Sequence, residues 1–160
     1  MIPAYQAVNR FWDFYLARDT IAYWLGAKGE ILTYERMDEL CRWNPEYFKR
    51  YDKDTLAKLK AWSYGKMGFD CSGLVCACFG VQGLSSWALR EHMSKVTSVQ
   101  ECKAGSILWK KGHVGLDLGY GIVGQTYAEG HTIELGQNTC FGFELGGEYD
   151  GADYSMMPNW

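Results

Sequence analysis

Cys71 is the residue of this sequence whose type and position best suit a nucleophile. It follows Asp70, a residue type that often caps a helix, and it precedes an apolar run that ends at Gly80. A thiol in the first turn of a helix lies beside unpaired backbone N–H groups and the positive end of the helix dipole, which favour the thiolate. The same N–H groups can hold the oxyanion of a tetrahedral intermediate. The pattern therefore indicates covalent catalysis by Cys71.

A cysteine nucleophile needs a base, and His113 is the best candidate. It begins an alternating stretch, residues 113–118, in which Val114 and Leu116 point to one face and His113 to the other. A lone histidine is more often an ordinary surface or core residue. Its place after a predicted turn at residues 111–112, together with a candidate nucleophile, favours the role of general base.

The third residue of the site follows from the pairing of two predicted strands. If the chain reverses through residues 119–121, Gly115 faces Gln125 and His113 faces Tyr127. Gln125 then shares a face with His113, and its carbonyl can accept the Nδ1–H of the imidazole. A strict two-residue turn would move Gln125 to the opposite face of the sheet from His113, unless a bulge restores the register. Three acidic residues are the alternatives for this position: Asp117, Glu129 and Glu134.

The elements that must position these residues change type along the chain. Helical spacing predicts a helix over residues 5–16, and Asp-led runs predict helices over 38–43 and 54–62, with a glycine-containing loop over 21–29. Residues 71–79 form a helix with Asp70 as its N-cap. Strands are expected over 106–110, 113–118, 122–127, 131–135 and 141–145, and no element is assigned to 146–160. This order is typical of an α+β fold, in which the nucleophile helix packs on an antiparallel sheet.

Length and charge restrict the class of protein. The 160 residues suffice for one substantial core, so we expect a single catalytic domain over 1–160 with its core at about 20–145. A net charge of −3 without a cationic block argues against nucleic acid as a partner. No run reaches the roughly 18 apolar residues of a membrane span, and no signal peptide is visible at the N-terminus.

The six cysteines do not predict a disulfide framework. Cys71 must stay a free thiol, and the other five cannot all pair with one another. The two cysteines of the sequence CAC, at residues 76–78, are too close within one helix for an unstrained bridge. His131 with Cys140 or Cys102 is a conceivable metal set, but no paired C-x-x-C or H-x-x-x-H spacing supports it. We therefore expect most of the cysteines to be reduced core or surface thiols, and we expect no metal and no cofactor.

Two segments resemble the signature blocks of the NlpC/P60 cysteine peptidases. These segments are residues 70–75, DCSGLV, and residues 112–121, GHVGLDLGYG. They occur in the family's order and at a compatible separation, and the resemblance spans roughly residues 21–125. The segment 23–26, YWLG, looks like the family's Tyr-containing loop, although it departs from the usual Tyr-x-Trp-Gly-Gly. The insertion over residues 30–67 is longer than in the commonest members, which affects the expected shape of the groove.

The resemblance implies a papain-like fold and a cysteine endopeptidase that acts on bacterial peptidoglycan. The implied reaction is hydrolysis of the bond between D-glutamate and a diamino acid in stem peptides, by Cys71, His113 and Gln125, without a metal. The third position is most often His in the family, so Gln125 is a minority choice. An enzyme of this kind acts on the cell wall and would be secreted or released. Three residues are implied to line the substrate groove: Tyr23, Asp70 and Ser72.

Two other functions stay open at this point. A papain-like amidase or acyl-transfer enzyme would share the mechanism and act on another amide or ester. A cell-wall binding module that has lost catalysis would bind without turnover, and the intact set of Cys71, His113 and Gln125 argues against it.

Overall fold

A six-stranded antiparallel sheet with a helix buried against it is the centre of the computed structural model, which describes residues 1–157. The strand order is β5-β10-β6-β7-β8-β9, and all five neighbouring pairs run antiparallel. The strands are β5 (Met93–Thr97), β6 (Ile107–Lys110), β7 (His113–Gly119), β8 (Ile122–Gln125), β9 (Glu134–Gln137) and β10 (Leu145–Tyr149). The expected α+β arrangement is confirmed.

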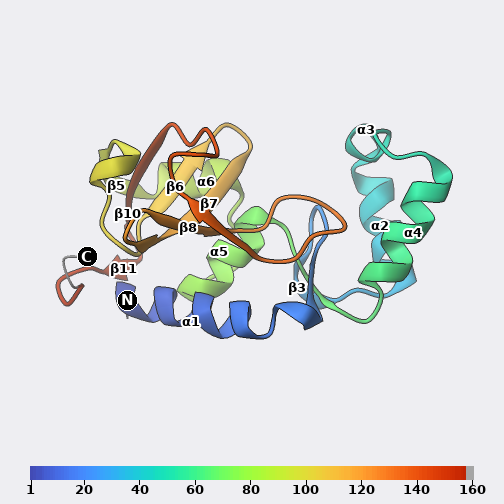
Figure 1. Cartoon of the computed structure of the whole chain (residues 1–160), viewed down its shortest axis with the longest axis horizontal. Coiled ribbons are helices and arrows are strands. Elements are labelled where there is room, and N and C mark those ends of the chain that lie inside the picture. Colours follow the sequence, from blue (N-terminus) through green and yellow to red (C-terminus); the bar gives the residue numbers. More distant parts are fainter. Residues whose placement is uncertain (158–160) are drawn as a thin grey trace.

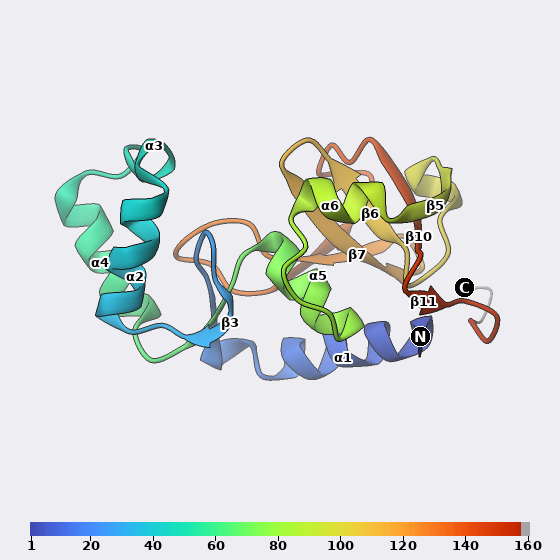
Figure 2. The same cartoon turned by 180° about the vertical axis from the view of Figure 1, so that it is seen from behind.

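Helix α5 (Cys71–Phe79) lies between this sheet and helix α1 (Ala4–Leu16), as Figures 1 and 2 show from opposite sides. Asp70 is its N-cap, because Oδ1 accepts the N–H of Gly73 at 2.7 Å. Gly80 ends the helix in the left-handed conformation at φ +71°, which glycine adopts without steric cost. Both predicted ends of this helix are confirmed.

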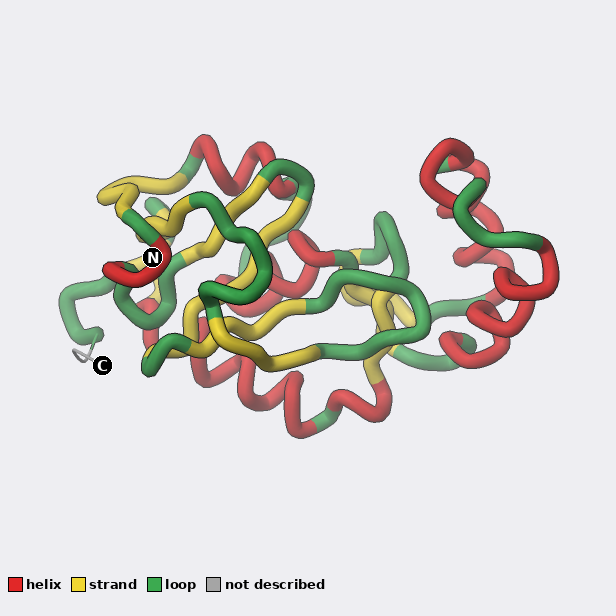
Figure 3. Tube along the Cα trace, turned by 45° about the horizontal axis from the view of Figure 1, so that its top comes forward, coloured by secondary structure: helices red, strands yellow, loops and turns green. Residues whose placement is uncertain are grey.

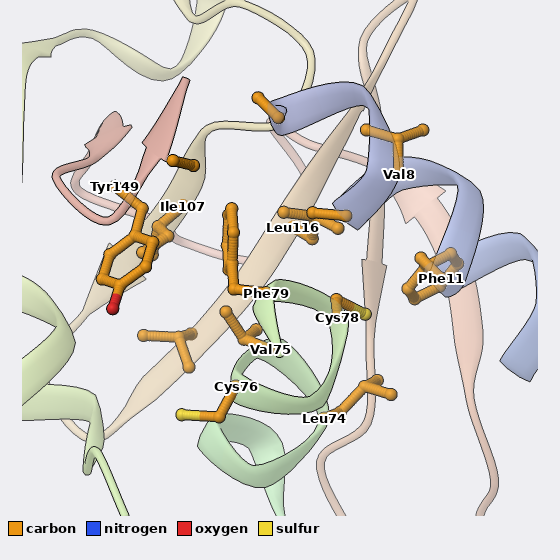
Figure 4. Packing of buried hydrophobic residues seen from close by; sticks show 14 of the residues in the cluster. Val8, Phe11, Leu74, Val75, Cys76, Cys78, Phe79, Ile107, Leu116 and Tyr149 are labelled. Carbon is orange, nitrogen blue, oxygen red and sulfur yellow. The ribbon is translucent and has the colours of Figure 1, made fainter. Parts of the chain in front are cut away.

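Apolar side chains around α5 form the main core. Figure 4 shows Val75 and Phe79 of α5 close to Leu116 of β7, and Phe11 of α1 at the edge of the same core. Nearly every side chain of α5 is buried, because the sheet covers one side of the helix and α1 covers the other. Cys71, at the end of this enclosed helix, keeps partial exposure. The core therefore fixes the axis that carries the nucleophile.

Residues 34–63 form a second group of helices, here called the helical lobe, which projects to one side of the sheet (Figure 1). The lobe contains α2 (Tyr34–Trp43), α3 (Pro45–Phe48) and α4 (Lys53–Ser63). A small sheet of β2 (Ile21–Tyr23), β4 (Met67–Phe69) and β3 (Lys28–Ile31) connects the lobe to α5. A second apolar cluster joins the lobe to the segment around β2 and β3, and in it Phe48 of the lobe stacks on Trp24 with ring centroids 5.5 Å apart.

In the first half of the chain, several helices and strands differ from those predicted from the sequence. The predicted loop over 21–29 contains β2 and the start of β3, which Gly26 and Gly29 concealed in the sequence. The helices predicted from Asp38 and Asp54 begin earlier, at Tyr34 and Lys53, because Thr33 and Asp52 are the residues whose side chains accept the capping N–H. The predicted helix over 5–16 is confirmed as α1.

The second half keeps three of the five predicted strands in place. β6, β7 and β8 occur where they were expected, whereas β9 begins at Glu134 rather than near residue 131, and β10 begins at Leu145 rather than at residue 141. Tertiary pairing decides these positions, since neither strand has a regular alternation of its own. Helix α6 (Ser86–Glu91), strand β5 and two short 3-10 turns, Arg18–Thr20 and Val99–Glu101, were not predicted.

The two ends of the described chain lie beside each other. Strand β1 (Ile2–Pro3) pairs in parallel with β11 (Ala152–Asp153), so part of the unassigned stretch 146–160 forms β10 and β11. Residues 158–160 of that stretch lie outside the described residues. Within residues 1–157, no helix has both the length and the apolar character that crossing a bilayer requires.

The hairpin of β7 and β8 has the register that the sequence predicts. Leu116 pairs with Gly124 and Asp117 with Val123, which is the pairing that puts Gln125 on the His113 face. At the tip, however, Gly119 pairs with Ile122, and the register shifts between residues 117 and 119. The turn is thus shorter than three residues, and a bulge restores the parity.

Gly124 is the point at which this hairpin is pressed against α1. A Cβ at this position would lie 2.1 to 2.6 Å from three ring carbons of Phe11. We expect Gly124→Ala to reduce the free energy of unfolding by about 1–3 kcal/mol or more, because the overpacked ring must move. Urea unfolding measures this change. Adding Phe11→Leu should recover part of the loss, and a double variant no more stable than Gly124→Ala would contradict the proposed clash.

Candidate active site

A cleft of about 500 Å³ opens between the helical lobe, the start of α5 and the β6–β7 and β8–β9 hairpins. Figure 3 shows the loop between β8 and β9 reaching toward the helical lobe. The cleft contains all three residues predicted to do the chemistry. Its lining residues are Tyr23, Leu25, Tyr47, Arg50, Cys71, Lys110, Gly112, His113, Gln125, Tyr127 and Phe141.

Cys71 is the first residue of α5 and lines this cleft. It lies next to the start of β7, where the backbone N–H of Val114 contacts it. Burial and the nearby Asp70 carboxylate raise the pKa of the thiol, while the backbone N–H groups of Val114 and Ser72 and the Lys28 ammonium oppose that shift. The expected lowering of the thiol pKa by the helix terminus is therefore not the net result. Desolvation outweighs the amide dipoles, so the thiol is protonated at neutral pH.

His113 and Gln125 form a hydrogen-bonded pair in which His113 Nε2 lies 2.8 Å from Gln125 Oε1. The ring nitrogen that faces Gln125 is Nε2 and not the Nδ1 of the sequence prediction. With Nε2–H donating to the amide oxygen, Nδ1 carries the lone pair and can accept a proton. The imidazole also stacks on Phe143, with centroids 5.5 Å apart and planes 20° apart. The ring is thus held by one polar and one aromatic contact.

Burial and the positive charge of Lys110 lower the pKa of His113, whereas its hydrogen bond to Gln125 raises it, and the net shift is downward. Burial is the largest of these effects. The imidazole is therefore neutral at pH 7 and able to accept a proton. Cys71 and His113 together form a neutral thiol and a neutral base.

The three acidic alternatives to Gln125 are engaged elsewhere. Glu129 accepts hydrogen bonds from the hydroxyls of Tyr47 and Tyr51 at 2.6 and 2.7 Å. Asp117 accepts from the N–H of Gly119, and burial raises the pKa of its carboxyl to about 6. Glu134 lies 2.7 Å from His131 Nδ1. Of the four candidates for the third position, Gln125 is the one that is hydrogen-bonded to His113.

Tyr23 lies in the cleft wall and is 4% exposed. Burial raises the pKa of its hydroxyl, and the negative charges of Tyr47, Cys71 and Glu129 in their ionised forms add to that shift. The hydroxyl therefore stays protonated at all physiological pH values and remains a hydrogen-bond donor. The substrate-binding role that the sequence resemblance implied for Tyr23 stays a prediction.

Asp70 and Ser72 lie behind the start of α5 and do not line the cleft. Lys28 Nζ contacts the two Asp70 carboxylate oxygens at 2.7 and 2.8 Å and donates to Ser72 Oγ at 3.0 Å. The N–H of Gly26 also donates to Asp70 Oδ2, at 3.2 Å. These contacts hold the first turn of α5 against the β2–β3 loop. Asp70 and Ser72 thus hold the helix that carries Cys71. They do not lie in the cleft lining, where the sequence resemblance had placed them.

Sequence reasoning missed several cleft residues. Lys110 pairs with His113 across the β6–β7 hairpin, so the strand pattern contained the signal for its position. Tyr127 follows β8 and was placed opposite His113, but no role was drawn for it. Tyr47 and Arg50 come from the helical lobe, and no local pattern connects that lobe with Cys71.

The conceivable metal residues are dispersed. His131 pairs with Glu134, and Cys140 Sγ lies 3.5 Å from Gln137 Oε1. Among residues 1–157, no group of three or more His, Cys, Asp or Glu side chains is arranged to hold a metal ion. All six cysteines are free thiols.

Comparisons with known proteins identify solved structures with a similar fold, but no protein with a closely similar sequence. No family model matches the chain, and no curated protein matches its sequence. The structure is similar to the peptidoglycan hydrolase RipB of Mycobacterium tuberculosis, with a TM-score of 0.55 and 20% identity over 94% of this chain and 67% of that one. It is also similar to NlpC1 of Trichomonas vaginalis, with a TM-score of 0.55 and 14% identity over 91% of this chain and 44% of that one.

A third similar structure is a mutated form of the resuscitation-promoting-factor-interacting protein RipA. Its TM-score is 0.55 and its identity is 17%, over 91% of this chain and 63% of that one. The chain thus has a papain-like α+β fold of the NlpC/P60 type, as the signature segments indicated. It spans less than two thirds of the length of two of these three structures.

Gln125→Ala tests the pair formed by Gln125 and His113. We expect kcat to fall by roughly 10–100-fold with little change in KM, because the imidazole loses its orientation while nucleophile and base remain. Gln125→Asn and Gln125→His should retain more activity, since each can supply an acceptor. Steady-state kinetics on a peptide substrate measure the effect. An unaltered kcat in Gln125→Ala would remove Gln125 from the site.

The pH dependence of kcat/KM tests the neutral resting pair. Because the pKa of His113 is lowered, the acid limb should have its midpoint below about pH 6.5, the ordinary value for His. Lys110→Met removes a positive charge and should raise the His113 pKa and move the limb to higher pH. Gln125→Ala removes a bond that favours the imidazolium and should move it to lower pH. Shifts in the same direction, or none, would contradict this assignment.

Proposed function

We propose that this chain is a cysteine peptidase that hydrolyses peptidoglycan stem peptides at the bond between D-glutamate and a diamino acid. The observation that supports this most is one cleft, in an NlpC/P60-like fold, lined by Cys71 at a helix start and by the 2.8 Å pair of His113 and Gln125. The similar structure of RipB, a peptidoglycan hydrolase, supports the choice of substrate.

The first chemical step forms a thioester. Cys71 Sγ attacks the carbonyl carbon of the scissile amide while His113 Nδ1 takes the thiol proton, since the resting pair is neutral. The carbonyl oxygen becomes an oxyanion beside the N–H groups of the first turn of α5. When the intermediate collapses, the C–N bond breaks and the imidazolium gives its proton to the departing amine.

The second step releases the acid product. Water attacks the thioester carbon while His113 takes a proton from it, and the thiol of Cys71 is regenerated with that proton. Gln125 keeps the same ring nitrogen directed at Cys71 in both steps. The amide of Gln125 carries no charge, so it orients the imidazole without the stabilisation of the imidazolium that a carboxylate would give.

The three residues implied to bind substrate divide into two roles in this proposal. Tyr23, whose protonated hydroxyl borders the cleft, contacts the substrate. Asp70 and Ser72 do not contact the substrate but position Cys71, since both are hydrogen-bonded to Lys28 behind the helix. Because peptidoglycan lies outside the cell membrane, the proposal requires that the protein reach the wall by secretion or release.

Cys71→Ala and His113→Ala test the proposal on purified muropeptides, with products identified by mass spectrometry. We expect each variant to lose roughly 1,000-fold or more of the activity, because the two residues act as one unit. Products split between D-glutamate and the diamino acid are expected from the unaltered chain. Circular dichroism checks that each variant is folded.

Matched controls come from residues outside the cleft. Cys140→Ala removes an exposed thiol and His92→Ala an exposed imidazole, and both should keep full activity. Full activity in a folded Cys71→Ala protein would overturn the nucleophile. Cleavage at another amide or ester, with the muropeptides left intact, would favour the alternative of a papain-like amidase or acyl-transfer enzyme.

A further inference from the structure

The charged side chains that line the cleft are cations. Arg50 enters from the helical lobe and Lys110 from the β6–β7 hairpin, and no Asp or Glu side chain of residues 1–157 belongs to the lining. The chain as a whole has a net charge of −3. The buried Glu129 carboxylate lies behind the wall, bonded to Tyr47 and Leu25, but the charged side chains that face the cleft are cationic, which favours a negatively charged ligand.

Some cations of this chain are neutralised within it: Lys28, Arg36 and Lys60 each pair with a carboxylate of the same chain. Within the described residues, neither Arg50 nor Lys110 forms an ion pair. Lys110 Nζ donates to the backbone carbonyl of Phe141, and Arg50 Nε donates to that of Tyr47 at 3.0 Å. Their charges are left for a partner from outside the chain.

The Arg50 guanidinium is held in place before any ligand arrives. Its Cζ lies 3.7 Å from the ring centroid of Tyr47, and the hydroxyl of Tyr47 donates to Glu129 Oε1 at 2.6 Å. Glu129 is buried and also accepts the hydroxyl of Tyr51 and the N–H of Leu25. Stacking and the Nε bond use one face and one nitrogen of the guanidinium, so its two terminal nitrogens can form a bidentate contact.

We propose that the cleft selects substrates with a free carboxylate beside the scissile bond, bound by Arg50 and assisted by Lys110. The inference rests on the proposed function, because it assumes that Cys71 and His113 cleave an amide in the same cleft. Arg50 and Lys110 are then specificity-determining residues. Aromatic and aliphatic residues form most of the remaining wall, which suits a short peptide better than a polyanion.

A carboxamide in place of that carboxylate should be rejected. It has the same shape, but it has one acceptor oxygen instead of two and turns N–H groups toward the N–H donors of Arg50. The loss of charge also removes the attraction to both cations. Stem peptides whose glutamate carries a free α-carboxylate are thus the expected substrates, and their amidated counterparts are poor ones.

The test uses L-Ala-γ-D-Glu-meso-diaminopimelate and the same tripeptide with the glutamate α-carboxylate converted to carboxamide. We expect the unaltered chain to favour the carboxylate peptide at least about 10-fold in kcat/KM. Arg50→Gln should reduce this preference to below about 3-fold, and Arg50→Lys should give an intermediate value because it keeps the charge and loses the planar fork. Lys49→Gln, which removes the neighbouring exposed cation, should keep the full preference.

Binding separates this inference from the proposed function. Calorimetry on the Cys71→Ala protein should show the same preference in Kd, and Arg50→Gln in that background should remove it. Turnover of both peptides at similar kcat/KM would overturn the carboxylate selection and leave the peptidase intact. No turnover of either peptide would overturn the proposed function, and the Kd ratio would then decide the selection alone, with equal Kd values rejecting it.

Discussion

The carboxylate of Asp70 is the interaction on which the active site depends. It accepts the N–H of Gly73 as the cap of α5, takes a second N–H from Gly26, and pairs with Lys28. A cap contributes about 1 kcal/mol to a helix, but here it also ties the start of α5 to the β2–β3 loop. A buried charge with this many donors is satisfied in one arrangement only, which fixes the point in space where Cys71 leaves the core.

The same carboxylate adds to the effect of burial on the candidate nucleophile. Burial of the thiol is the main cause of its raised pKa, and the negative charge of Asp70 raises the Cys71 pKa further, against the opposing backbone N–H groups. Burial lowers the His113 pKa, and the hydrogen bond to the neutral Gln125 raises it too little to restore the ordinary value. Support for the helix and activation of the thiol thus work in opposite directions at Asp70. The proposed mechanism therefore uses transfer of the proton to His113 during attack rather than a thiolate formed beforehand.

A second buried carboxylate, Glu129, organises the other wall. It lies in the β8–β9 loop and accepts the hydroxyls of Tyr47 and Tyr51 from the helical lobe. These bonds connect the loop that follows Gln125 with the insertion that carries Arg50. Burial and the Glu129 carboxylate raise the Tyr51 pKa to about 12 and also raise the Tyr47 pKa, so both donors remain protonated at physiological pH. One carboxylate and two phenols thus join the two walls of the cleft.

The sequence by itself determined the elements that depend on residues close together in the chain. The capping Asp70, the apolar run to Gly80 and the alternation from His113 define the nucleophile helix and the base strand, and the strand parity placed Gln125 beside His113. Which ring nitrogen faces Gln125 and the net shift of the Cys71 pKa required the structure, because both depend on burial among segments far apart in the chain. The positions of Arg50 and Glu129 were equally beyond the sequence, since only the packing of the helical lobe against the β8–β9 loop brings them to the cleft.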